Sequence, residues 1–278
     1  MSKLGAFGHF SKGWIDENTL TASEPGFGTP VTVEKWSAGG HQAIKECFLE
    51  INYLNLFRHP NIVKLIGHCS KENYMILVYE FIPKGSLDRH LFGGSHDQTL
   101  PWVTRIKVAV GAARALAFLH DNENPIVHRN FNTADILLDG EFNAKLCNFG
   151  LAMKGPMGNR TEVMGTCGYA APEYFATGRR LTTKYDVYSF GVVLVDLLTG
   201  RKSVDGNSWP INECNLVHWA TPYLRRKKTL SRIMDPKLEG QFPHKAAFAV
   251  ATIALQCLRQ IPEQRPSMAK VLVSLEQL

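Results

Sequence analysis

Short apolar runs characterise the first third of the chain, and apolar residues recur at helical spacing over the remainder. Alternation at Val31 and Val33 predicts a strand after a polar loop that ends at Pro30. Residues 62–67 and 76–81 also read as strands. Between them, residues 42–56 carry a helical pattern, so this third is expected to pair a sheet with one helix.

From Pro83 onwards the pattern becomes helical. Ile106, Val110, Ala113 and Ala117 recur at helical spacing in a segment that ends near His120. Further helices are predicted at 186–198, where Gly200 stops the pattern, around Leu216, at 247–258, and from Met268 to the end.

A strand-rich first third followed by helices predicts an α+β protein with two lobes, residues 1–82 and residues 83–278. The 278 residues are 45% hydrophobic and 20% charged, which is typical of a soluble globular protein. No stretch reaches the roughly 18–20 apolar residues that cross a bilayer. Met1-Ser2-Lys3 lacks a signal peptide's apolar core and the glycine that myristoylation needs, so we expect a cytoplasmic protein.

Cysteines and charge exclude several classes of site. The six cysteines are widely spaced without a C-x-x-C pair, so buried, reduced thiols are expected rather than zinc ligands or disulfides. Net charge is +6 with a pI near 9.0. The only dense basic run is Arg225-Arg226-Lys227-Lys228, which is short and has no interleaved aromatic residues. It favours a solvated patch over a nucleic-acid interface.

Four ordered motifs carry the most specific information: NIVKLIG at 61–67, LVYEF at 77–81, GTCGYAAPE at 165–173 and DVYSFG at 186–191. Through them the chain resembles the kinase domain of plant receptor-like cytoplasmic kinases over nearly its whole length. The resemblance implies a bilobal Ser/Thr protein-kinase fold, with an antiparallel sheet in the N-lobe and helices in the C-lobe. It also implies ATP and magnesium as the family's cofactors.

The same resemblance assigns structural roles to residues that this chain keeps. Glu173 is expected to pair with Arg265 inside the helical lobe, and Asp186 is expected to support the catalytic loop. His128 and Phe149 are expected to join a hydrophobic column between the lobes. These residues maintain shape and transfer no phosphate.

The residues at the chemical positions depart from the family pattern. Asn130 follows His-Arg where such enzymes carry the catalytic Asp, and Asn148 begins the motif that is otherwise D-F-G. Glu34 occupies the place of the phosphate-holding Lys, Asn132 that of the catalytic-loop Lys, and Asp135 that of the catalytic-loop Asn. Phosphoryl transfer needs a base, a phosphate-holding Lys and a metal-holding Asp. None of the three is in its expected place.

Glu34 would face Glu50, the acid on the first large helix that normally pairs with the missing Lys. Two carboxylates about 4 Å apart repel by roughly 4 kcal/mol at an effective dielectric near 20. We therefore expect one carboxyl to be protonated or the helix to swing away. Lys35 should point to the opposite face of the strand, unless a one-residue slip lets it substitute.

The amides weaken both catalysis and metal binding. Asn130 cannot act as a useful base, and Asn148 lacks the charge that grips magnesium. Asp135 partly offsets this loss, because Asn and Asp have exchanged places between the two metal positions. A weak cation site at Asp135 therefore remains an alternative.

The nucleotide pocket is altered too. Lys3 stands at the first glycine of the phosphate loop, which leaves Gly5 and Gly8. Phe10 and Thr32 replace the small Val and Ala above adenine, and we expect the phenyl ring to fill that space unless it rotates outward. The family's adenine pocket would also include Tyr79, Glu80 and Leu137.

The activation segment, residues 148–173, has a normal length and keeps Thr161 and Thr166. Arg129, which in the family reads a phosphate on this segment, is also kept. Phosphorylation of Thr161 by another kinase could order the segment through an ion pair. The alternative is that Thr161 is an ordinary exposed residue.

We therefore interpret the chain as a pseudokinase, a scaffold, allosteric partner or decoy in plant signalling, including immunity. Its expected partners are proteins, either active kinases or immune receptors, which could bring it to the plasma membrane. Two alternatives remain open: a nucleotide-binding switch, and an active Ser/Thr kinase that uses Lys3 or Lys35 for phosphates and Asp135 for metal. The late start of the first strand also leaves open a truncated relic.

Overall fold

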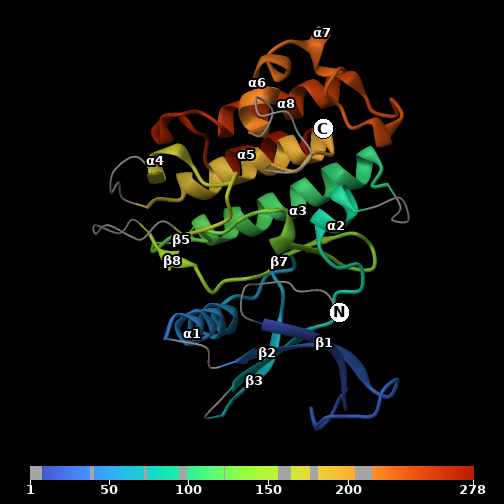
Figure 1. The fold of residues 1–278 in the computed structure, drawn as a ribbon, viewed down its shortest axis with the longest axis vertical. Coiled ribbons are helices and arrows are strands. Elements are labelled where there is room, and N and C mark those ends of the chain that lie inside the picture. The colour runs from blue at the N-terminus through green and yellow to red at the C-terminus, as the bar shows by residue number, and fades with distance from the viewer. Residues whose placement is uncertain are drawn as a thin grey trace.

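The computed structural model describes residues 8–37, 41–71, 74–93, 99–121, 123–155, 164–175, 181–203 and 215–278. Figure 1 shows a sheet-bearing N-lobe at one end of the long axis and a helical C-lobe at the other. The antiparallel N-lobe sheet runs in the order β1-β2-β4-β3. Its strands are β1 (Gly8–Ile15), β2 (Thr29–Ser37), β3 (Leu65–Lys71) and β4 (Tyr74–Glu80).

Helix α1 (His41–Leu56) packs against β3 and β4. Its buried face carries Ala43, Cys47, Ile51 and Leu54, which recur at the spacing of an amphipathic helix. The same face also buries Glu50. The predicted helix at 42–56 is therefore confirmed, and the fold places a carboxyl among its apolar residues.

The strand boundaries at 62–67 are wrong. Ile62 forms an isolated parallel bridge with Leu146 of the C-lobe, so β3 begins only at Leu65. A bulge between Leu65 and Gly67 then shifts the register against β4. This segment is held by two lobes at once, which a period-two pattern does not reveal.

The C-lobe follows the predicted α+β division, with helices α3, α5, α8 and α9 packed on one another. Their bounds are α2 (Leu87–Phe92), α3 (Trp102–His120), α4 (Pro172–Phe175), α5 (Lys184–Thr199), α6 (Leu216–Leu224), α7 (Lys227–Leu230), α8 (His244–Cys257) and α9 (Met268–Glu276). Short strand pairs join β5 (Ile126–Val127) to β8 (Met153–Lys154) and β6 (Ile136–Leu138) to β7 (Ala144–Leu146). The described residues also form the 3₁₀ turns η1 (Thr133–Asp135), η3 (Pro236–Leu238) and η4 (Pro262–Gln264).

Helix α5 forms the centre of this lobe, because every residue from Tyr185 to Thr199 is buried. Gly200 ends it with a φ of 63°, and its N–H donates to the carbonyl of Asp196 at 2.8 Å. A Cβ at Gly200 would lie 2.3 Å from the carboxylate of Asp235, so only glycine fits this position.

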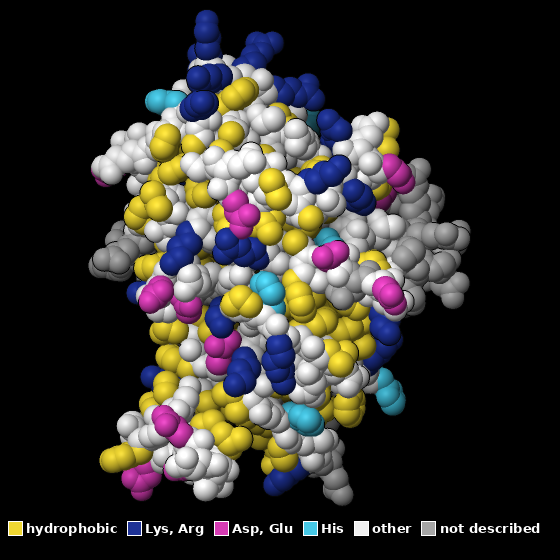
Figure 2. All heavy atoms as spheres, turned by 180° about the vertical axis from the view of Figure 1, so that it is seen from behind, with side chains coloured by type: hydrophobic (Ala, Val, Ile, Leu, Met, Phe, Trp, Pro, Cys, Tyr) yellow, Lys and Arg dark blue, Asp and Glu magenta, His cyan; other side chains and the backbone are white. Residues whose placement is uncertain are grey.

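Basic side chains are unevenly distributed over the surface. Lys and Arg side chains gather at the pole of the C-lobe near α7 (Figure 2). No helix among the described residues is long and apolar enough to span a bilayer.

The expectation of buried thiols holds only in part. Cys47 and Cys257 are buried and Cys147 is half-buried, but Cys69 and Cys167 are exposed. All five are free thiols. The sixth cysteine, Cys214, lies outside the described residues.

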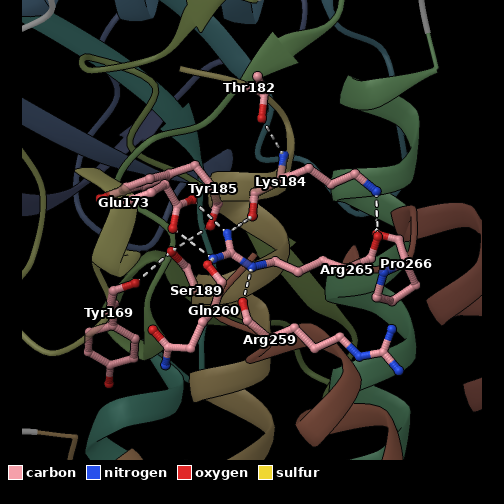
Figure 3. Close-up of polar contacts among 10 residues, drawn as sticks. All are labelled: Tyr169, Glu173, Thr182, Lys184, Tyr185, Ser189, Arg259, Gln260, Arg265 and Pro266. Atoms are coloured by element: carbon pink, nitrogen blue, oxygen red, sulfur yellow. Dashed lines mark hydrogen bonds and ion pairs between the residues drawn. The ribbon is translucent and has the colours of Figure 1, made fainter. Parts of the chain in front are cut away.

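The predicted pair between Glu173 and Arg265 is confirmed (Figure 3). Both terminal nitrogens of Arg265 donate to the two carboxylate oxygens of Glu173 at 2.7 Å, and its Nε donates to the carbonyl of Arg259 at 2.7 Å. Lys184 on α5 in turn donates to the carbonyl of Arg265 at 2.6 Å. This network ties the end of the GTCGYAAPE motif to α5 and to the turn that follows η4.

Replacing Arg265 should destabilise the protein strongly. In Arg265→Met the carboxylate of Glu173 loses a partner whose side chain is 0% exposed, which costs about 3–5 kcal/mol. The matched control is Arg114→Met, since Arg114 pairs with Glu276 where the side chains are 50% and 39% exposed. That change should cost less than about 1 kcal/mol. Urea unfolding measures both, and equal losses would contradict the structural role of the buried pair.

Candidate functional site

Asp186, at the start of α5, anchors the catalytic-loop segment through hydrogen bonds. Its carboxylate oxygens accept the backbone N–H groups of His128 at 2.8 Å and Arg129 at 2.9 Å. Arg129 has a φ of 75°, a left-handed conformation that costs a non-glycine residue on the order of 1 kcal/mol. The two hydrogen bonds hold this conformation, and the predicted role of Asp186 is confirmed.

The hydrophobic column is also present. The rings of His128 and Phe149 meet edge to face with centroids 5.1 Å apart, and both residues are fully buried. Phe149 then reaches Phe57, just after α1, at 5.6 Å. The C-lobe loop is therefore joined to the N-lobe helix through three aromatic rings.

Asp135 gathers the three amides that replace catalytic residues. Its carboxylate accepts N–H from Asn130 at 3.0 Å and from Asn148 at 2.8 Å, and Asn132 donates to the same oxygen as Asn130. The Asn148 backbone is left-handed with a φ of 66°, a conformation that Asn tolerates well. Burial raises the pKa of Asp135 to about 8, while the hydrogen bonds from Asn148 and Asn132 oppose that rise. The four residues satisfy one another.

This arrangement does not fit a magnesium ion. Magnesium takes oxygen ligands at about 2.0–2.1 Å in octahedral geometry. Here the oxygens of Asp135 face three N–H groups, whose positive ends occupy the directions from which a cation would approach. No group of three or more candidate metal ligands occurs in the described parts of the chain.

Thr166 of the activation segment also joins the hydrogen-bond network around Asp135. Its hydroxyl donates to the side-chain oxygen of Asn130 at 2.8 Å and accepts from the amide of Asn132 at 3.2 Å. The oxygen of Asn132 caps the following turn by accepting from the N–H of Ala134 at 2.8 Å. The segment therefore rests on the substituted loop through uncharged hydrogen bonds.

Glu34 and Glu50 meet between β2 and α1, and each is only 4% exposed. The hydroxyl of Tyr79 on β4 donates to Glu34 at 2.9 Å and also interacts with Glu50. Helix α1 has not swung away. The two expected outcomes were protonation of one carboxyl and displacement of the helix. This geometry fits protonation.

The pKa values of the pair follow from this burial. Desolvation raises the pKa of Glu34 to about 7, although the hydrogen bond from Tyr79 opposes the rise. Desolvation and the charge of Glu34 raise the pKa of Glu50 to about 8. At neutral pH the pair is therefore at least partly protonated. In the family pattern a lysine stands at the position of Glu34 and pairs with the helix glutamate, so no proton is needed there.

Lys35 does not rescue the missing cation. Glu34 pairs with Leu77 and Lys35 with Ile76, so the β2–β4 register contains no slip. Lys35 is exposed, and its ammonium lies 4.6 Å from the ring centre of Tyr74. The alternation argument is confirmed, and the alternative of a slipped strand is wrong.

The predicted pocket residues share one face of the sheet. Phe10 pairs with Glu34, and Thr32 pairs with Tyr79 on β4, so their side chains point to the same side. Phe10 and Thr32 are half-buried, and so is Leu137 on β6. Gly8 begins β1, whereas Lys3 and Gly5 lie outside the described residues.

Glu80, predicted as a pocket residue, forms a hydrogen bond and an ion pair with two lysines. One of its carboxylate oxygens accepts the backbone N–H of Lys64 at 2.9 Å and the ammonium of Lys145 at 3.0 Å. Lys145 lies on β7, so this ion pair joins the end of β4 to the C-lobe. No sequence pattern indicates this ion pair, because the three residues are far apart along the chain.

Arg129 contacts Tyr174, a residue for which the sequence predicted no role. Its guanidinium donates to the hydroxyl of Tyr174 at 2.8 and 3.1 Å, and that hydroxyl also accepts the N–H of Met164 at 3.2 Å. Thr161 lies outside the described residues, so its phosphorylation stays a prediction.

Residues 3–275 match the family described as protein tyrosine and serine/threonine kinase. The chain belongs to this kinase family. Its kinase domain is 55% identical over 278 residues to Probable serine/threonine-protein kinase PBL2 of Arabidopsis thaliana, covering 99% of this chain and 65% of that protein. PBL3 of the same plant is 54% identical with the same coverage. Receptor-like cytoplasmic kinase 176 of Oryza sativa subsp. japonica is 50% identical, with 99% and 70% covered.

These relatives confirm the resemblance to plant receptor-like cytoplasmic kinases, a class of Ser/Thr protein kinases. Kinases of this family use ATP and magnesium. The chain spans 65% of the length of the first two relatives, so it corresponds to part of those proteins.

The buried acid pair should make this kinase domain less stable as pH rises. In the unfolded chain both carboxyl groups have a pKa of 4.5, so between about pH 4.5 and 8 the folded state binds more protons. The free energy of unfolding therefore falls as pH increases through this window.

Glu34→Gln/Glu50→Gln should flatten this fall in urea titrations at several pH values, because neither amide has a proton to lose. Titrating groups that do not interact with the pair are present in both proteins and cancel in the comparison. The control is Glu239→Gln/Glu263→Gln, which removes two exposed carboxyl groups. An unchanged slope in the buried double variant would contradict the protonated pair.

Proposed function

We propose that this kinase domain is a pseudokinase of the receptor-like cytoplasmic type, which acts by binding other proteins and not by transferring phosphate. The observation that carries the proposal is the Asp135 network, in which three amides occupy one carboxylate. A metal-dependent kinase needs carboxylates that are free to hold its cation. Here that position is closed by the protein's own N–H groups.

The acid pair supports the same proposal. A nucleotide triphosphate is strongly anionic, and the family's lysine would hold its phosphates. Glu34 offers a carboxyl there, and Tyr79 and Glu50 enclose it. When protonated it brings no positive charge, and when ionised it repels the phosphates. Either state removes the electrostatic attraction that nucleotide binding uses.

The retained frame supports a role in recognition. The GTCGYAAPE motif is held by Arg265 on one side and by Asn130 and Asn132, through Thr166, on the other. A surface kept in the shape of a kinase can bind the partners of active relatives without processing them. We propose that its partners are proteins, either active kinases or immune receptors. We also propose a cytoplasmic location, because the rice relative is named a cytoplasmic kinase.

A second candidate is an active Ser/Thr kinase with atypical residues. It is favoured by the names of the relatives and by the intact Asp186 and Glu173–Arg265 supports. It would require Asp135 to leave its amides and bind metal. Phosphate transfer separates the two candidates directly.

The purified protein should transfer no phosphate to itself or to generic acceptors. It should also show no rise in melting temperature with millimolar ATP and magnesium, since a ligand that binds the folded state stabilises it. Incorporation of label that disappears in Asp135→Asn would favour the active kinase. A thermal shift without transfer would instead identify a nucleotide-binding switch.

Rebuilding the polar site alone should not restore activity. The first variant carries Glu34→Lys, Asn130→Asp, Asn132→Lys, Asp135→Asn and Asn148→Asp. We expect it to remain inactive because Phe10 and Thr32 still stand above the adenine position. Adding Phe10→Val, Thr32→Ala and Lys3→Gly should bring activity, since all these parts act as a unit. A five-residue variant that is already a good kinase would show that the pocket was never blocked.

A further inference from the structure

The pole of the C-lobe carries a group of cations with no role in the site. Arg225, Arg226, Lys227, Lys228 and Arg232 are all exposed, and we call them the polar cap. Figure 1 places α7 at the end of the long axis opposite the N-lobe sheet, and Figure 2 shows dark-blue side chains projecting from that end.

The backbone presents these cations in a fixed way. Leu224 and Leu230 are buried on either side of the run and anchor it in the core. Between them, the hydroxyl of Thr229 donates to the carbonyls of Tyr223 and Arg226 at 3.1 Å. The N–H of Leu230 also donates to the carbonyl of Arg226 at 3.1 Å. The polar cap is therefore an ordered turn and not a loose basic tail.

Nearby acids do not neutralise the polar cap. Residues 215–245 contain seven Lys and Arg but only two acids, Asp235 and Glu239. The carboxylate of Asp235 is buried and paired with Arg105 at 2.5 Å, so its charge is directed inward. Within the described residues, none of the five cap side chains forms an ion pair. Helix α8, which packs against α7, begins with His244 and Lys245 and has no acid in its first turn.

We propose that the polar cap docks this protein on the anionic surface of a lipid bilayer. A planar surface of phosphate and carboxylate groups suits cations that project outward from a convex tip, whereas a phosphate-binding pocket would surround its ligand. No fixed hydrogen-bond geometry is required, because the attraction is summed over many headgroups. Tyr223, two residues before the run, is half-buried, and tyrosine is a residue type enriched at the headgroup depth of bilayers.

Docking at this pole would orient the molecule. The C-lobe would meet the bilayer end-on and leave the N-lobe directed away from it (Figure 1). This inference does not depend on whether the kinase domain transfers phosphate.

Vesicle flotation tests the proposal with the purified chain. It should float with phosphatidylcholine vesicles that contain about 20 mol% phosphatidylserine, and not with pure phosphatidylcholine. Flotation should be lost when salt is raised from about 0.05 M to about 0.5 M, where charges are screened over a few ångströms. Lys227→Gln/Lys228→Gln should lower the partition coefficient about 30-fold, and changing Arg225 and Arg226 to Gln as well should abolish binding.

The matched control removes four exposed lysines elsewhere, Lys45, Lys64, Lys154 and Lys270, by substitution with Gln. It has the same net charge as the four-residue cap variant and should still float. Circular dichroism melting confirms that both variants fold.

Any of the following results would overturn the proposal: no flotation at low salt, equal flotation of the cap variant and the wild type, equal loss in the control, or displacement from vesicles by millimolar inorganic phosphate. Displacement by phosphate would indicate a discrete anion pocket. Tighter retention on duplex DNA than on anionic vesicles would assign the polar cap to nucleic acid instead.

Discussion

The carboxylate of Asp186 holds together the segment on which the rest of the site depends. It is buried at the start of α5, and it accepts the N–H groups of His128 and Arg129 in a strained turn. That turn positions Asn130, Asn132 and Asp135, and through His128 it supports the aromatic contact with Phe149. Because these hydrogen bonds involve backbone N–H groups, they persist whichever side chains follow in the loop.

A support of this kind explains how the chemical positions could change without loss of the fold. The residues at these positions have partners within the protein: the amides donate to Asp135, and the hydroxyl of Tyr79 donates to Glu34 and interacts with Glu50. Buried polar groups must be satisfied, and this requirement can be met without a cation. The residues at these positions therefore have hydrogen-bond partners within the protein.

Several parts of the site followed from the sequence because they depend on local geometry or on ordered motifs. Strand alternation alone placed Lys35 on the outer face, and the motif frame identified the Glu173–Arg265 pair. Other parts did not follow. The choice between a protonated pair and a displaced α1, the contact between Arg129 and Tyr174, and the bridge from Glu80 to Lys145 all join distant segments. The exposed Cys69 and Cys167 failed the expectation for the same reason, since burial depends on what packs above a residue.

The sequence by itself determined the family, the two-lobe α+β division, and which residues stand at the chemical positions. These are carried by periodicity and by residue identity in ordered motifs, which need no coordinates. The tertiary structure decided what those residues do to one another. Hydrogen bonding and desolvation act over a few ångströms between residues as distant as Glu34 and Tyr79 or Asp135 and Asn148, and only the folded chain brings such groups together.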